Sequence, residues 1–195
     1  MGAINEIFAY LVQTFLSLYL IAMLLRFVLQ VVRADFYNPI CQFLVKITNP
    51  LVIPTRRVVP AAAGIDLASL LLAYLLQVAG IAALVFIKLG GFPPVGILLM
   101  GGALGVVALL VNIYFFALLA MIILSWVAAG SRHPAIYLLY QITEPVMAPF
   151  RKALPAMGGI DFSPILLFIL INIIQIALRH MAAAAGVLGL APWLS

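Results

Sequence analysis

The sequence predicts an all-α membrane protein with four transmembrane helices in two parallel two-helix repeats, each with a short interfacial helix and a Pro-rich cytoplasmic loop. Three observations predict this fold. Of the 195 residues, 67% are hydrophobic and only 8% are charged, whereas a soluble domain carries roughly 25% charged residues. The chain contains an internal repeat. Its cations are concentrated in two of the predicted loops.

The repeat is centred on the segment from Thr48 to Asp66, which recurs 95 positions later from Thr143 to Asp161. Aligned without gaps, residues 38–66 and 133–161 are identical at 12 of 29 positions. Membrane composition would produce matches at Leu and Ile, but it would not align four prolines, an arginine, a glycine and an aspartate. We define the duplicated motif as Pro50, Pro54, Arg56, Arg57, Pro60, Gly64 and Asp66 with Pro145, Pro149, Arg151, Lys152, Pro155, Gly159 and Asp161.

The first repeat is expected over residues 1–88, with spans at about 7–30 and 67–87. Each apolar run has the roughly 20 residues that a bilayer-spanning helix needs. Arg26 lies near the end of the first span, where we expect its side chain to snorkel to the interface. Residues 39–48 have apolar side chains at helical spacing but are too short to span, so they are expected to form an interfacial helix.

The prolines of the motif remove backbone donors and restrict the residues before them, so a long regular helix is not expected there. Asp66 stands directly before the second apolar run, in the position of a helix N-cap. Asp161 stands likewise before the last run, with Pro164 in its first turn. We expect both aspartates to cap helices and to pair with the motif cations. An ion or proton site is the alternative, since acidic groups at membrane depth often mark pathways.

A Gly/Pro-rich connector is expected over residues 89–102 and the second repeat over residues 103–195, with spans at about 103–128 and 162–181. The apolar run from Val95 to Val127 is too long for one span and too short for two. The offset of 95 resolves this, because it aligns the first span with residues 103–126. The Gly-rich start is therefore interpreted as a partly embedded approach or a kinked beginning, and whether it enters the bilayer stays open.

The loop cations predict the orientation of the chain. They are Arg33, Lys46, Arg56 and Arg57 in the first motif loop and Arg132, Arg151 and Lys152 in the second. The positive-inside rule then places both motif loops in the cytoplasm and both termini outside it. The net charge of +5 indicates contact with anionic lipid headgroups and not with nucleic acid.

The sequence indicates neither an enzyme nor a bound cofactor or metal. The single Cys41 excludes an internal disulfide and a Cys-based metal site. His133 and His180 fall near opposite ends of the fourth-span region, so one haem held by both is not expected. No Ser-His-Asp set, P-loop or pair of carboxylates in one element is evident. Gln77 and Asn172, related by the offset of 95, form a candidate intramembrane polar pair that either lines a cavity or hydrogen-bonds between helices.

The paired pattern P-x-x-x-P-x-R-[RK]-x-x-P-x-x-x-G-I-D, flanked by spans, resembles the YggT family of bacterial inner-membrane proteins. Ser125-Trp126 and Arg26 also resemble the helix-end pattern of that family, although Gln30-Val31 and Met121 replace them in the other repeat. The resemblance covers nearly the whole chain. It implies a multi-pass protein of the bacterial inner membrane, so that the termini placed outside the cytoplasm by the loop cations are expected to be periplasmic. It also implies links to osmotic or salt stress, to division genes and, in plastids, to haem attachment. It implies no molecular activity.

Two functions stay open at this point. One is a non-enzymatic scaffold or assembly factor linked to envelope, osmotic-stress or division processes, whose motif face binds an unknown membrane or cytoplasmic protein or organises lipid. The other is a small ion channel or transporter that contributes to osmotic balance. The sequence favours the scaffold, because no Asp, Glu, Lys or Arg lies in the middle of a span. A homo-oligomer is compatible with either function.

Overall fold

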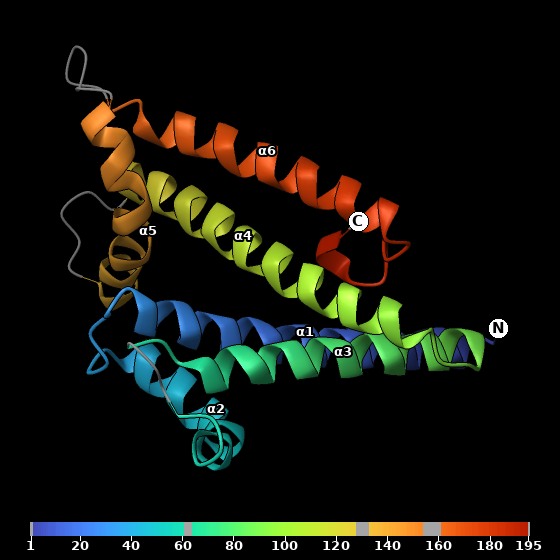
Figure 1. The fold of residues 1–195 in the computed structure, drawn as a ribbon. Helices are drawn as coiled ribbons and strands as arrows, with labels where there is room; N and C mark the ends of the chain where they lie inside the picture. The colour runs from blue at the N-terminus through green and yellow to red at the C-terminus, as the bar shows by residue number, and fades with distance from the viewer. Residues whose placement is uncertain (1, 61–63, 128–132, 154–160, 195) are drawn as a thin grey trace.

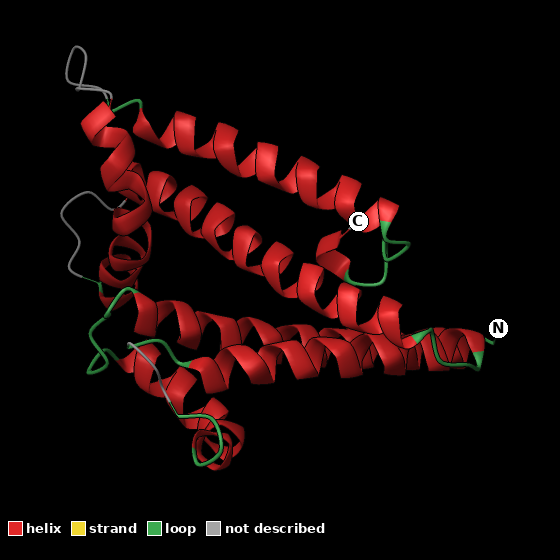
Figure 2. Cartoon of the chain, in the orientation of Figure 1, coloured by secondary structure: helices red, strands yellow, loops and turns green. Residues whose placement is uncertain are grey.

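Four long helices and two shorter crossing helices make up the computed structural model, which describes residues 2–60, 64–127, 133–153 and 161–194. Helices α1, α3, α4 and α6 are long and apolar enough to cross a membrane, and Figure 2 shows no strand in the described part of the chain. The chain is therefore an all-α, multi-pass membrane protein, which confirms the predicted fold class. In chain order the elements are α1 (Ala3–Val31), α2 (Pro39–Arg56), α3 (Leu67–Leu89), α4 (Val95–Val127), α5 (Pro134–Ala153), α6 (Ser163–Ala184) and the 3₁₀ turn η1 (Pro192–Leu194).

The two repeats run in the same direction through the bundle. Helices α1–α2–α3 form the first repeat and α4–α5–α6 the second. Helices α2 and α5 lie across one end of the bundle, which we call the motif end (Figure 1). The start of α1 and the end of α6 lie at the opposite end, the terminal end. This parallel arrangement brings the two copies of the motif to the same end of the molecule.

Helices α2 and α5 are longer than expected. Each passes through two prolines of the motif, Pro50 and Pro54 in α2 and Pro145 and Pro149 in α5. The prediction that no long regular helix forms here was wrong. All four prolines are exposed, so the carbonyl groups that lose a helical partner can be solvated outside the packed side of the helix.

The apolar residues of α2 are divided between two faces. Its buried residues are Cys41, Leu44, Thr48 and Val52, which pack toward α1 and α3. Ile40 and Phe43 are 38% and 61% exposed and are therefore available to the bilayer. An apolar outer face on a helix at the bundle end fits the interfacial position that the sequence predicts.

Helix α4 begins at Val95, so the Gly-rich segment forms its first turns and neither precedes nor kinks the helix. A Cβ added at Gly105 would lie 2.8 Å from Nε2 of Gln77, and one added at Gly102 would overlap Val78. Both neighbours belong to α3. The glycines are therefore needed for the close approach of α4 to α3, where the second repeat packs against the first.

The repeats also meet at the motif end. Nδ2 of Asn38 donates to the carbonyl oxygen of Pro134 at 2.9 Å, and the amide of Asp35 donates to Oε1 of Gln141 at 3.3 Å. A hydrophobic cluster below these bonds joins α1, α2, α4 and α5 through Val28, Leu29, Cys41, Leu44, Ala117, Leu138 and Ile142. The loop between α1 and α2 is thus tied to α5 of the second repeat.

Candidate functional site

In the first repeat, Arg56 and Asp66 form a short ion pair that joins α2 to α3. Nη2 of Arg56 lies 2.6 Å from Oδ2 of Asp66, and Arg56 also donates to Oε1 of Gln30 at 3.0 Å. Gly64, with φ of 80°, turns the chain between the two residues. Asp66 caps α3 as predicted, because Oδ1 accepts from the amide of Ser69 at 3.4 Å and Oδ2 from its hydroxyl at 2.6 Å.

Arg26 completes this network from α1. Its Nη1 donates to Oγ1 of Thr48 at 2.7 Å and to Oδ1 of Asn49 at 2.8 Å, and its Nε lies 3.8 Å from Oδ2 of Asp66. The side chain is only 5% exposed. The expectation that Arg26 snorkels to the interface was wrong, because α2 supplies acceptors that hold its guanidinium inside the protein.

The environment of Asp66 keeps it ionised. Burial by itself raises the pKa of the Asp66 carboxyl, but hydrogen bonds from Arg56 and Ser69 outweigh burial and hold the pKa below its ordinary value. The carboxyl group has no exposed side-chain surface. Its charge is therefore neutralised within the protein and is not offered to solvent.

The second repeat has the same arginine–aspartate pair in an open setting. Nε of Arg151 lies 3.0 Å from Oδ2 of Asp161, and Nη1 of the same arginine lies 2.6 Å from Oε2 of Glu144. Asp161 is 41% exposed. Its Oδ1 accepts from the amide of Ser163 at 2.9 Å, although α6 begins one residue later than expected and Phe162 occupies the N-cap position. Pro164 lies in the first turn as predicted.

The pKa of the Asp161 carboxyl is also lowered. Its slight burial raises the pKa, while hydrogen bonds from Ser163 and Arg151 lower it further than burial raises it. Met121 stands where the first repeat has Arg26, and its Sδ lies 2.8 Å from Oγ1 of Thr143. The second motif site therefore lacks the buried cation of the first.

The remaining motif residues divide into exposed and undescribed ones. Arg57, Pro60 and Lys152 are exposed, and Arg57 and Lys152 make no side-chain hydrogen bond or ion pair in the described part of the chain. Pro155 and Gly159 lie outside the described residues, as does Arg132 of the same loop. Thus Arg56, Asp66, Arg151 and Asp161 form the predicted contacts, whereas Arg57 and Lys152 do not pair with the aspartates.

The mid-span amides Gln77 and Asn172 do not meet. Gln77 is buried in α3 against Gly105, whereas Asn172 is exposed on α6 and donates to the carbonyl oxygen of its own helix at Phe168, 2.8 Å away. Helices α3 and α6 make no contact in the structure. A different pair crosses between helices: Nε2 of Gln175 donates to Oδ1 of Asn112 at 3.0 Å.

The Asn112–Gln175 pair lines a cleft of about 650 Å³ between the two repeats, with walls from α1, α4, α5, α6 and η1. From the sequence, Asn172 of α6 was named but Gln175 was not. The sequence does contain a signal for Gln175, because this residue is the second side-chain amide of α6, one turn beyond Asn172. A cleft of this volume, lined mainly by apolar side chains with a few polar groups, has the character of a ligand site.

Among the described residues no group of three His, Cys, Asp or Glu side chains is placed to hold a metal ion. His133 accepts a hydrogen bond from the amide of Ala135 at the start of α5, at the motif end. His180 lies near the end of α6, at the terminal end. What the motif sites do provide is charge pairing that fixes α2 and α5 to the bundle.

Comparison with known proteins gives one family. The sequence model of the protein family described as CCB3/YggT matches residues 5–87 and 100–182 of this chain. The chain is 45% identical over 190 residues to an uncharacterized protein of Pseudomonas aeruginosa, covering 95% of each. It is 43% identical over 177 residues to the uncharacterized protein YggT of Escherichia coli K12, covering 91% of this chain and 92% of that one. A 70-residue stretch is 34% identical to the uncharacterized protein ycf19 of Galdieria sulphuraria, covering 35% of this chain and 71% of that protein. No solved structure matches the chain.

Proposed function

This chain belongs to the CCB3/YggT family, and we propose that it acts as a non-enzymatic scaffold or assembly factor of the bacterial inner membrane. The observation that carries the proposal is the position of α2 and α5 at the motif end, each fixed by an arginine–aspartate pair (Figure 1). The outer sides of these helices form a surface that we call the platform. Its exposed residues include Phe43, Lys46, Arg57, Tyr137 and Lys152.

In this proposal the ion pairs position the platform and do not themselves bind a partner. Arg56 and Asp66 already satisfy each other, together with Gln30 and Ser69. A partner that used them would have to break buried charge pairs, which is costly. The exposed cations and aromatics are free of such bonds, and they suit contact with anionic headgroups and with a partner protein at the membrane surface.

We further propose that the platform faces the cytoplasm and that both termini are periplasmic. Most cations of the sequence lie in the two motif loops, while Lys88 and Arg179 lie toward the terminal end. The positive-inside rule favours this orientation. A fusion of alkaline phosphatase or of a fluorescent protein to the C-terminus tests it, because the first is active only in the periplasm and the second only in the cytoplasm.

Photocrosslinking from the platform tests the scaffold function. A photoreactive residue at Phe43 or Tyr137 is expected to capture one and the same protein in native membranes, and Phe92, exposed at 70% at the terminal end, is the matched control. Capture from both helices should fall when Arg56→Ala loosens α2, while the membrane level of the protein is followed separately. Equal capture from Phe92, or capture of lipid alone, would contradict the scaffold.

The link to osmotic stress, envelope maintenance or division is tested in a deletion strain. Wild-type protein and a Lys46→Glu/Lys152→Glu variant are compared for growth and cell length in high-salt medium. Both lysines are exposed, so their exchange should preserve folding and reverse the local charge. We expect the variant to insert normally but fail to restore the wild-type phenotype. Full restoration would show that the platform charges have no role in the process.

A small channel or transporter is the second candidate, and the polar pair in the cleft between repeats is the observation that favours it. Ion flux into proteoliposomes under K⁺, Na⁺ and H⁺ gradients tests it. Flux that disappears in Asn112→Leu/Gln175→Leu, and persists in Gln77→Leu, would favour a path through the cleft over the scaffold. No flux under any gradient would remove this candidate.

A further inference from the structure

The cleft between the repeats has an amphipathic lining. Of its fifteen lining residues, only Asn112, Gln175 and Arg179 are polar, and the rest are apolar. Apolar walls come from both repeats, with Ile21 and Leu25 on α1 facing Ile113 and Ala117 on α4. Ligand sites are lined in this way, mostly by apolar side chains with a few polar groups, and the volume of about 650 Å³ is that of a ligand site.

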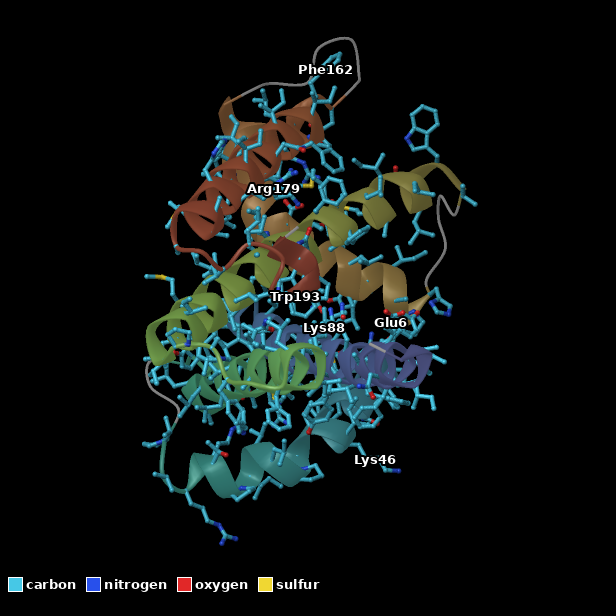
Figure 3. All side chains as sticks on the ribbon, turned by 90° about the vertical axis from the view of Figure 1, so that its right-hand side faces the viewer. Glu6, Lys46, Lys88, Phe162, Arg179 and Trp193 are labelled. Carbon is cyan, nitrogen blue, oxygen red and sulfur yellow. The ribbon has the colours of Figure 1, made fainter. Side chains whose placement is uncertain are left out.

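Two of the three polar groups, Gln175 and Arg179, come from the second half of α6. Gln175 and Arg179 are one turn apart on α6, so their side chains share a face of that helix. Arg179 lies about 24 Å along the helix axis from Ser163, at 1.5 Å per residue, which places it near the terminal end. Figure 3 views the molecule from that side and labels Arg179 on α6 and Trp193 on the C-terminal turn, both of which line the cleft.

Arg179 has no counterion among the described residues. It makes no hydrogen bond or ion pair in the described part of the chain, unlike Arg26, Arg56 and Arg151, which all contact carboxylates. A guanidinium binds phosphate oxygens in a bidentate manner. At the boundary of the hydrocarbon region, the anion that is present in abundance is the phosphate group of a phospholipid.

We propose that this cleft binds an anionic glycerophospholipid of the surrounding bilayer. One acyl chain lies between the repeats against the apolar residues of α1 and α4, and the phosphate group pairs with Arg179. The Asn112–Gln175 hydrogen bond joins the two amides to each other, so that the phosphate group is left to Arg179. The lipid fills the space between two repeats that otherwise touch mainly at α3–α4 and at the motif end.

Native mass spectrometry of the detergent-purified chain tests the proposal with phosphatidylglycerol and phosphatidylcholine as probes. We expect one phosphatidylglycerol to be retained and to resist exchange with phosphatidylcholine. Arg179→Gln should weaken phosphatidylglycerol binding about tenfold, the scale of one charge-assisted hydrogen bond, and weaken phosphatidylcholine binding less, because the choline cation of that lipid already offsets the charge of its phosphate. Lys88→Gln, which removes another exposed cation at the terminal end (Figure 3), is the matched control and should bind as the wild type does.

The position of the lipid is tested with a phosphatidylglycerol that carries a photoreactive diazirine in its acyl chain. Label should fall on α4 between Ala108 and Ala117 and on α1 near Ile21, and Ala117→Phe should remove it by filling the cleft. If Ala117→Phe does not fold, the labelled peptides of the wild type decide alone. Label confined to the outer face of α6, at Ile169 and Ile173, would indicate annular lipid and overturn the proposal. Equal phosphatidylglycerol affinity in Arg179→Gln and Lys88→Gln would also overturn it.

Discussion

The two repeats carry the same arginine, glycine and aspartate in register, yet their motif sites differ in burial and in charge. In the first, one carboxylate is enclosed by two guanidinium groups, and the Asp66 side chain has no exposed surface. In the second, one guanidinium group lies between two carboxylates, and Asp161 is 41% exposed. The first site therefore has one excess positive charge and the second has one excess negative charge.

This difference arises at two positions outside the motif where the two repeats carry different residues. Arg26 and Asn49 in the first repeat correspond to Met121 and Glu144 in the second. Arg26 reaches in from α1 and closes the first site, whereas Glu144 pairs with Arg151 on the same helix and leaves the second site open. Identical motif residues thus have unequal energetic roles, and we expect substitutions in the two copies to have unequal effects.

The largest contrast is expected between Asp66→Asn and Asp161→Asn. Asp66→Asn leaves two guanidinium groups at a buried site without a counterion, which should cost about 3–5 kcal/mol of unfolding free energy. Asp161→Asn affects a solvent-screened pair and should cost no more than about 1 kcal/mol. Unfolding in mixed micelles with increasing dodecyl sulfate measures both. Equal losses would mean that the two sites are equivalent in spite of their different burial.

The next contrast concerns the exchanged position itself. Arg26→Met gives the first repeat the residue of the second and removes the charged hydrogen bonds to Thr48 and Asn49. We expect a loss of about 3 kcal/mol or more, since two hydrogen bonds to a charged group are removed and each contributes about 1.5–3 kcal/mol. Met121→Leu, a volume-conserving control, should cost less than about 1.5 kcal/mol. The same micelle titration compares the unfolding free energies of the two variants. An unfolding free energy of Arg26→Met equal to that of the wild type would show that the buried guanidinium is dispensable for stability.

A third contrast compares the packing of equivalent positions on α1 and α4. Gly102 lies where α4 meets α3, whereas its counterpart Ile7 on α1 is 60% exposed. Gly102→Ala should cost about 1–3 kcal/mol through overpacking against Val78. Gly96→Ala, with no atom within 4 Å of an added Cβ, should instead stabilise by about 0.5–1 kcal/mol through helix propensity. Thermal unfolding followed by tryptophan fluorescence reports both, and equal shifts would contradict close packing at Gly102.

The smallest expected effect is that of acid. Both aspartates have pKa values below their ordinary range in the folded protein, so their stabilisation is fully present above about pH 4 and is lost as the pH falls through the folded pKa. The melting temperature should therefore decline as the pH falls below about 4. Asp66→Asn should show a shallower decline than Asp161→Asn, because it removes the more buried of the two carboxylates. Parallel curves for the two variants would contradict this assignment.

The sequence was sufficient to predict the helical class, the four spans and the pairing of Arg56 and Arg151 with their aspartates. Length and apolarity determine spans, and a duplicated motif at a fixed offset requires that its members occupy equivalent places. Asp66 was identified as a cap because its position before an apolar run is a local property of the chain. Such local features can be read without knowledge of the packing.

The features that sequence reasoning missed depend on packing across helices. Arg26 was expected at the interface because the acceptors on α2, Thr48 and Asn49, lie 22 and 23 residues away. Proline was taken to end α2, but its cost depends on whether the freed carbonyl faces solvent. Gln77 was paired with Asn172 by symmetry, although α4 separates their helices. The cleft arises only when the two repeats are placed together.

The parallel direction of the repeats has a consequence for synthesis. Each repeat carries its own pair of spans and its own cationic loop. The same topological signals therefore occur twice during insertion, and we expect both repeats to insert in the same orientation. Neither half needs the other to acquire its orientation. A polypeptide with one copy would therefore reach an equivalent arrangement by associating with a second molecule inserted in the same sense, whereas inverted repeats would require two molecules of opposite orientation.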